Sequence, residues 1–194
     1  MKGISSIFFL LCFSLLGWSQ NLIPNHSFEL YDTCPDSFGD FENLEYWFKT
    51  NVGSPDLFCD CYPTNSIPSS LELKKPSNGN CLSGMLLIDE TSTIMQALES
   101  IAVELNQPLE INERYCFTMD VVSSSKVRYV VKNLNLGLDD KSLVSSSPVV
   151  TSPDRILNLS NDIIYDTTNW VSLKTEFIAY GTEKYIYIYI YIYI

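Results

Sequence analysis

The chain has 194 residues, which is enough for one domain or at most a small pair of domains. Its formal net charge is −11, from 12 Lys and Arg against 23 Asp and Glu. This charge argues against nucleic-acid or anionic-membrane binding, because both require a basic surface. His26 is the only histidine, so neither a histidine-rich metal site nor a Ser-His-Asp triad is expected. The composition favours an acidic, folded module without obvious catalysis.

Residues 1–19 have the features of a secretory signal peptide. Lys2 supplies a positive start, and Ile7–Leu16 is an apolar run that only Ser14 interrupts. This run is shorter than the roughly 20 apolar residues that a membrane-spanning helix needs, but it suits a signal-peptide core. Small residues lie at the expected cleavage point, which precedes residue 20. We therefore expect an exported protein with no membrane span in the mature chain.

Export changes the interpretation of the six cysteines, one of which lies within the signal peptide. In an oxidising compartment the remaining cysteines are disulfide candidates. Cys34 and Cys61 are the preferred pair because both lie in a loop-rich region, and Cys81 with Cys116 is a second candidate pair. A zinc site around Cys59 and Cys61 is the alternative, although their one-residue spacing is tighter than is usual for zinc ligands.

The elements expected along the mature chain are mostly strands. Ser27–Leu30 alternates polar and apolar residues, and residues 31–79 are rich in Pro, Asp, Asn, Ser and Cys, which indicates long loops. The residues from Thr93 to Leu105 fit either a helix or a strand. The fold class predicted is an all-β antiparallel sandwich of the jelly-roll type. The clearest strand-like runs, rich in β-branched and aromatic residues, are 83–89, 115–122, 127–138 and 171–178.

The chain ends in a Tyr-Ile repeat over residues 185–194. A TA dinucleotide repeat read in triplets encodes this repeat, so we interpret the product as truncated or frameshifted, with residues 20–184 as the jelly-roll module. The repeat is also a perfect period-two strand pattern with one Tyr face and one Ile face. Two outcomes are open: the final strand of the module is missing, or the tail replaces it. An unpaired tail of this composition would be prone to aggregation.

Several segments together resemble a known family. The opening Asn-Leu-Ile-Pro-Asn-His-Ser-Phe-Glu is similar to the start of galactose-binding-like jelly rolls, which include many carbohydrate-binding modules. The whole set resembles an exported subgroup that precedes OmpA-like domains in Bacteroidota-type bacteria. The chain departs from that pattern at His26, where the family usually has Pro, and at its end, where relatives continue into a final strand. The matching segments are 21–29, 31–35, Trp47, 53–58 with Cys61, 114–117, 169–173, 177–181 and 183–186.

The resemblance implies a jelly-roll binding module of the cell envelope, with a glycan or another envelope component as its partner. It also implies a possible structural calcium ion, for which Glu29 matches the opening ligand of the family. No other cofactor is expected. The late aspartate ligand of the family belongs to the strand that this chain lacks, which leaves that site incomplete.

Three functional readings follow. A non-catalytic binding module would use Tyr46, Trp47 and Tyr62, because aromatic rings stack on sugar faces; the same rings could instead pack in the core. A structural spacer without a ligand is the second reading. A glycoside hydrolase is the least favoured, because the adjacent acid pairs, Asp89-Glu90 and Asp139-Asp140, would point to opposite faces of a strand.

Overall fold

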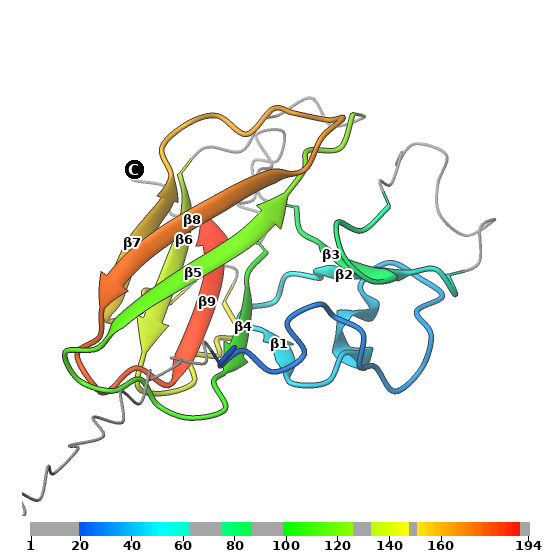
Figure 1. Cartoon of the computed structure of the whole chain (residues 1–194). Coiled ribbons are helices and arrows are strands. Elements are labelled where there is room, and N and C mark those ends of the chain that lie inside the picture. Colours follow the sequence, from blue (N-terminus) through cyan, green and yellow to red (C-terminus); the bar gives the residue numbers. More distant parts are fainter. Residues whose placement is uncertain (1–19, 63–74, 87–98, 126–132, 148–150, 191–194) are drawn as a thin grey trace, which may run out of the picture.

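The computed structural model describes residues 20–62, 75–86, 99–125, 133–147 and 151–190, so the predicted signal peptide lies outside the described residues. These ranges hold a short 3-10 helix and strands that pair antiparallel throughout. The all-β class predicted from the sequence is confirmed (Figure 1). The elements are η1 (Asp40–Asn43), β1 (Trp47–Lys49), β2 (Asp56–Cys59), β3 (Cys81–Gly84), β4 (Ile101–Glu104), β5 (Arg114–Val121), β6 (Leu134–Asp139), β7 (Arg155–Ser160), β8 (Val171–Ile178) and β9 (Tyr185–Ile190).

The strands form one large sheet and two small ones. The large sheet has five strands in the order β1-β4-β9-β6-β7, and the small sheets are the pairs β2-β3 and β5-β8. The β5-β8 pair lies across the large sheet as the second layer of a sandwich (Figure 1). The β2-β3 pair lies beside this sandwich together with the loops that follow the N-terminal residues.

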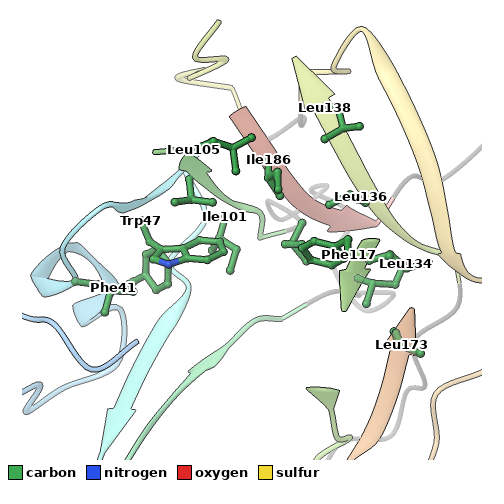
Figure 2. Close-up of a cluster of buried hydrophobic side chains, with 14 of the residues drawn as sticks. Phe41, Trp47, Ile101, Leu105, Phe117, Leu134, Leu136, Leu138, Leu173 and Ile186 are labelled. Atoms are coloured by element: carbon green, nitrogen blue, oxygen red, sulfur yellow. The ribbon is translucent and has the colours of Figure 1, made fainter. Parts of the chain in front are cut away.

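The second layer shows why these residues form strands. On β8, Leu173 and Phe177 are buried while Lys174 and Glu176 are exposed. On β5, Phe117 is likewise buried between exposed neighbours. This alternation is typical of an antiparallel pair with one face on the core and one in water. Side chains from both layers meet in one hydrophobic cluster, as Figure 2 shows for Phe117 and Leu173 against Leu134 and Ile186.

The Tyr-Ile repeat supplies the central strand of the large sheet. β9 pairs with β4 along one edge and with β6 along the other. Ile186 and Ile188 point into the main core, while Tyr187 and Tyr189 are buried on the opposite face of the sheet. Of the two outcomes that the sequence left open, the tail therefore takes a strand position, at least as far as Ile190.

The neighbours of β9 fit its large tyrosines. Tyr187 lies opposite Ala102 on β4 and opposite Gly137 on β6. A Cβ atom on Gly137 would approach the Tyr187 Cβ to 3.0 Å and the Pro153 Cγ to 2.4 Å. The two smallest side chains thus flank a fully buried tyrosine, which gives its ring the room that close packing requires. The neighbouring strands therefore leave space for the tyrosine side chain.

Hydrogen bonds fix the start of β9. The Tyr187 hydroxyl donates to the Lys141 carbonyl at 2.7 Å and accepts from the Leu143 N–H at 2.9 Å. The Tyr185 hydroxyl donates to a Glu104 carboxylate oxygen at 2.9 Å. These contacts tie the tyrosines to the loop after β6 and to β4. They set a register that the repeat itself leaves open, because a shift of two residues changes no side chain.

The sequence located some strands and misplaced others. β5 and β8 match the predicted runs closely, whereas β7 was not expected and Ser27–Leu30 is not a strand: a turn over residues 24–27 precedes irregular chain. The ambiguous run that ends at Leu105 is a strand over its last part, β4; residues 93–98 lie outside the described residues.

The described residues contain no helix with the length and apolarity needed to cross a bilayer.

Candidate functional site

The three predicted stacking residues do not share a surface. Trp47 is 7% exposed, packs against Phe28 at a ring-centroid distance of 5.1 Å, and donates from its indole N–H to a backbone carbonyl. Tyr62 is 3% exposed and contacts Phe58. Only Tyr46 is exposed, with a positive φ of 72°. The burial of Trp47 and Tyr62 agrees with the core packing that the sequence left open as the alternative for these rings, and a role of the three residues in binding stays a prediction.

Glu29 joins two loops through hydrogen bonds. One carboxylate oxygen accepts the backbone N–H groups of Asn80 at 2.7 Å and of Cys81 at 3.0 Å, and the other accepts the Asn80 side-chain amide. Gly79 makes this approach possible, because a Cβ there would lie 2.2 Å from a Glu29 oxygen. Calcium needs six to eight oxygen ligands. The described surroundings of Glu29 are N–H donors, so they do not fit a calcium site.

A second group of carboxylates lies at the end of β6. Oxygen atoms of Asp139, Asp140 and Asp154 lie within 4.8 Å of one another. Asp139 is buried, however, and its two oxygens already accept the backbone N–H groups of Lys141 and Asp154. The Lys141 ammonium lies 4.0 Å from Asp140. The hydrogen bonds of Asp139 join the end of β6 to the chain before β7, so we interpret this carboxylate as structural. The other acid pair, 89–90, lies outside the described residues.

The cysteines correct one predicted pair. Cys34 bonds to Cys61 as expected, whereas Cys81 bonds to Cys59, with Cα atoms 4.1 Å apart. Cys59 and Cys81 lie directly opposite each other in the β2-β3 register, which places their side chains together. Cys116 is a free, exposed thiol on β5 in the other layer. Because Cys59 and Cys61 are both oxidised, the alternative zinc site has no thiolates here.

The two disulfides stabilise a region that we call the disulfide lobe: β2, β3 and the loops that carry Cys34 and Cys61. The bonds close loops with sequence separations of 27 and 22 residues. Loops of this length correspond to about 3 kcal/mol of stabilisation each in the chain-entropy model. The lobe therefore forms a rigid wall beside the sandwich, although its strands are short.

Between this lobe and β5 lies a cleft of about 860 Å³, which we call the β3–β5 cleft. Its floor includes the core side chains Leu134, Ile186 and Ile188, and its walls come from the lobe on one side and β5 on the other. Figure 1 shows β5 with β8 on one side and the β2-β3 pair toward the other. The volume lies within the range of about 300–1,000 Å³ that is usual for ligand sites.

One end of the cleft is bridged by Trp170. Its side chain lines the cleft, and its indole N–H donates to the Lys75 carbonyl at 3.0 Å. This bond joins the start of β8 to the chain that leads into β3, across 95 residues of sequence. Trp170 thus links the two walls by a hydrogen bond. Its position at the start of a strand gave no indication of this contact.

The described lining carries negative formal charge only. Asp56 on β2 and Asp120 on β5 line the cleft, and no lysine or arginine is among its described lining residues. Burial raises the pKa of the Asp56 carboxyl, an effect that the Gly39 N–H opposes and the nearby Asp40 charge reinforces. A neutral or cationic ligand would be favoured in such a cleft, and an anionic ligand disfavoured.

A buried glutamate supports the wall of the lobe. Glu99 is 6% exposed, and its carboxylate accepts the backbone N–H groups of Leu86 and Ser54. Burial raises the pKa of this carboxyl; the Leu86 hydrogen bond opposes the rise and the Asp56 charge adds to it. Glu99 therefore connects the chain after β3 to the loop before β2, directly beside the cleft.

Comparison with known proteins provides no match: no family model fits the chain, and no curated protein or solved structure is similar to it. The resemblance to galactose-binding-like modules thus stays a prediction.

Sequence reasoning missed the cleft itself. Its floor and walls come from segments that are far apart in the chain, and most of its residues are apolar side chains typical of any core. The sequence indicated one wall only as the strand-like run at 115–122. In the structure this strand has one partner strand among the described residues.

Proposed function

We propose that the chain is an exported, non-catalytic binding module of the cell envelope that holds its ligand in the β3–β5 cleft. The observation that carries this proposal is the cleft: its size suits a ligand, its floor is apolar, and one of its walls is braced by two disulfides. A concave pocket lined mostly by apolar side chains is the usual position of a binding site.

Two features support export. Disulfides persist in oxidising compartments, and the described residues contain two of them. The N-terminal residues, as argued from the sequence, have the order of a signal peptide. A protein delivered outside the cytoplasm would meet envelope components, which include glycans and the extended segments of other envelope proteins.

The charge of the cleft narrows the class of ligand. Asp56 and Asp120 repel anions, so phosphorylated or sulfated ligands would bind poorly. A neutral or cationic ligand with an apolar face would match the apolar side chains that line the cleft. Exposed apolar lining, such as Leu86 at 49% exposure, would contribute about 25 cal/mol for each Å² that the ligand removes from water.

A matched pair of surface variants tests the site. Leu86 lines the cleft and is 49% exposed, whereas Val144 is 66% exposed and lies outside the cleft lining. We expect Leu86→Asp to weaken binding of neutral envelope-derived ligands by about tenfold or more, because it places an uncompensated charge against their apolar face. Val144→Asp makes the same change elsewhere and should leave binding unaltered.

The measurement is titration of the full chain with neutral peptidoglycan fragments, neutral oligosaccharides and extended peptides. Equal binding by Leu86→Asp and Val144→Asp would place the ligand outside the cleft. Absence of binding by every class would favour the spacer reading instead.

A further inference from the structure

The way in which strands contribute to the β3–β5 cleft is informative. A strand that lines a cleft with one face contributes every second residue, because side chains alternate across a strand. The cleft instead takes consecutive residues, 115–124 around β5 and 81–86 around β3. Consecutive lining is what the edge of a strand produces. The cleft is therefore bounded by two strand edges, one on each side.

Both edges lack a partner strand within the described residues. β5 pairs only with β8, and β3 pairs only with β2. An open edge presents a row of backbone N–H and C=O groups, which is a template for an additional strand. On the β3 side part of this row is already bonded, because the Cys81 N–H donates to Glu29 and Leu86 exchanges hydrogen bonds with Glu99. An inserted strand would pair there with the residues between these two points and, on its other edge, with β5.

The floor specifies what such a strand must carry. Leu134, Ile186 and Ile188 belong to the main core and also line the cleft. The large sheet has five strands, whereas the second layer above it has only β5 and β8. A strand beside β5 would lie over this buried floor and would contact the more exposed apolar side chains of the lining, Met85 and Leu86. Its inward side chains should be apolar, and alternate ones should face water.

The charges of the cleft lining indicate which charged residues an inserted strand should carry. With Asp56 on one wall, Asp120 on the other and no described cationic side chain in the lining, an inserted strand with basic residues is electrostatically favoured. The two strand edges also bring main-chain polar groups to the cleft, and these match the backbone of another polypeptide.

We propose that the β3–β5 cleft binds an extended, basic polypeptide segment of another protein as an added β-strand, paired with β3 on one side and β5 on the other. The strand would join β2-β3 and β5-β8 into one sheet opposite the five-stranded sheet. This inference rests on the proposed function and names the ligand class of the same site. β-strand addition draws affinity from main-chain hydrogen bonds and specificity from alternate side chains.

The probe is a dye-labelled synthetic peptide of about eight residues, the usual length range of a strand, in which Val and Thr alternate between terminal Lys residues. Its control has the same sequence except for Pro in place of one central residue, which removes one N–H donor and disrupts the extended pairing. We expect the full chain to bind the alternating peptide, measured by fluorescence anisotropy, about tenfold or more tightly than the Pro peptide, because main-chain hydrogen bonds are lost.

Two charge reversals locate the peptide. Asp120 lines the cleft on β5, and Asp162 is an exposed aspartate outside the cleft lining. Asp120→Lys should weaken binding of the Lys-ended peptide several-fold, while Asp162→Lys, with the same change in net charge, should have a much smaller effect. Equal effects of both variants, or equal affinity for the alternating and Pro peptides, would overturn the inference.

The outcomes separate this inference from the proposed function. If peptides fail but a neutral oligosaccharide binds and is lost in Leu86→Asp, the cleft is a ligand site and strand addition is wrong. If neither class binds in the cleft, both proposals are wrong. If the alternating peptide binds with the expected sensitivity to Pro and to Asp120→Lys, both stand.

Discussion

The hydroxyl of Tyr62 is buried without a hydrogen-bond partner among the described residues. Burial and the charges of Asp40, Asp56 and Asp36 raise the pKa of this phenol, so it stays protonated. An unsatisfied buried hydroxyl costs about 1–3 kcal/mol. The ring itself packs against Phe58 and needs no polar atom.

We expect Tyr62→Phe to raise the free energy of unfolding by about 1 kcal/mol, because it removes an unsatisfied group and keeps the ring. Tyr187→Phe is the matched control: its hydroxyl bonds to Lys141 and Leu143, and burial raises its pKa to about 12. That variant should lose stability by about 1–3 kcal/mol. Urea unfolding measures both, and a loss in Tyr62→Phe would show that its hydroxyl has a partner.

Glu99 makes stability depend on pH in a defined direction. Its folded pKa lies above the ordinary value of 4.5, so the folded state binds more protons there than the unfolded state. The stability that this group contributes is present below 4.5 and is lost as the pH rises through the folded pKa. Asp56 is shifted in the same direction. Glu183 has the opposite dependence, because backbone N–H donors outweigh its burial and lower its pKa. The stability that it contributes is lost as the pH falls through that lowered pKa.

Thermal unfolding should therefore show a decline in stability from about pH 5 to neutral pH. We expect Glu99→Gln to flatten that decline because it removes the titrating group, and to be less stable than the wild type overall because its amide NH2 cannot accept the second backbone N–H. Glu113→Gln, at an exposed position, is the control and should keep the wild-type profile. A wild-type profile in Glu99→Gln would mean that this carboxylate does not cause the pH dependence.

At the scale of elements, β9 is constrained on both edges and on both faces. Every described side chain from Ile186 to Tyr189 is buried, with isoleucine toward one side and tyrosine toward the other. A one-residue slip would exchange the two faces, while a two-residue slip would preserve them. The repeat is thus sensitive to the parity of an insertion rather than to its length.

Insertion after Lys184 tests this parity. One additional Thr should destabilise the domain strongly, because it sends tyrosine toward the isoleucine side and clashes with a close-packed core. A Tyr-Ile pair at the same point should have a small effect, although it is twice as long. Comparable losses in the two insertion variants, measured by urea unfolding, would indicate that β9 has no fixed register.

The sequence predicted elements where periodicity was local. β5 and β8 alternate over eight residues each, and the pattern alone defines them. β7 was missed because the apolar and polar residues of its sequence do not alternate clearly enough to identify a strand. The role of β9 depended on Ala102 and Gly137, whose distant places in the chain gave no sign that they would flank Tyr187.

At the scale of the whole molecule, the candidate site is a consequence of unequal layers. Five strands face two, and the disulfide lobe stands beside the narrower layer. The sequence predicted one disulfide of this lobe but paired Cys81 wrongly, because connectivity depends on the β2-β3 register. The cleft could not be predicted either, because it lies between elements whose relative positions do not follow from their order in the chain.

Hydrogen exchange of the unliganded full chain tests the account most directly, because it reports strand pairing amide by amide. β9 has a partner on both edges and β5 on one. We expect the β9 amides to be among the slowest to exchange, and alternate amides of β5 to exchange as fast as those of exposed loops. Rapid exchange throughout β9, or uniform protection along β5, would contradict a central Tyr-Ile strand and an open β5 edge.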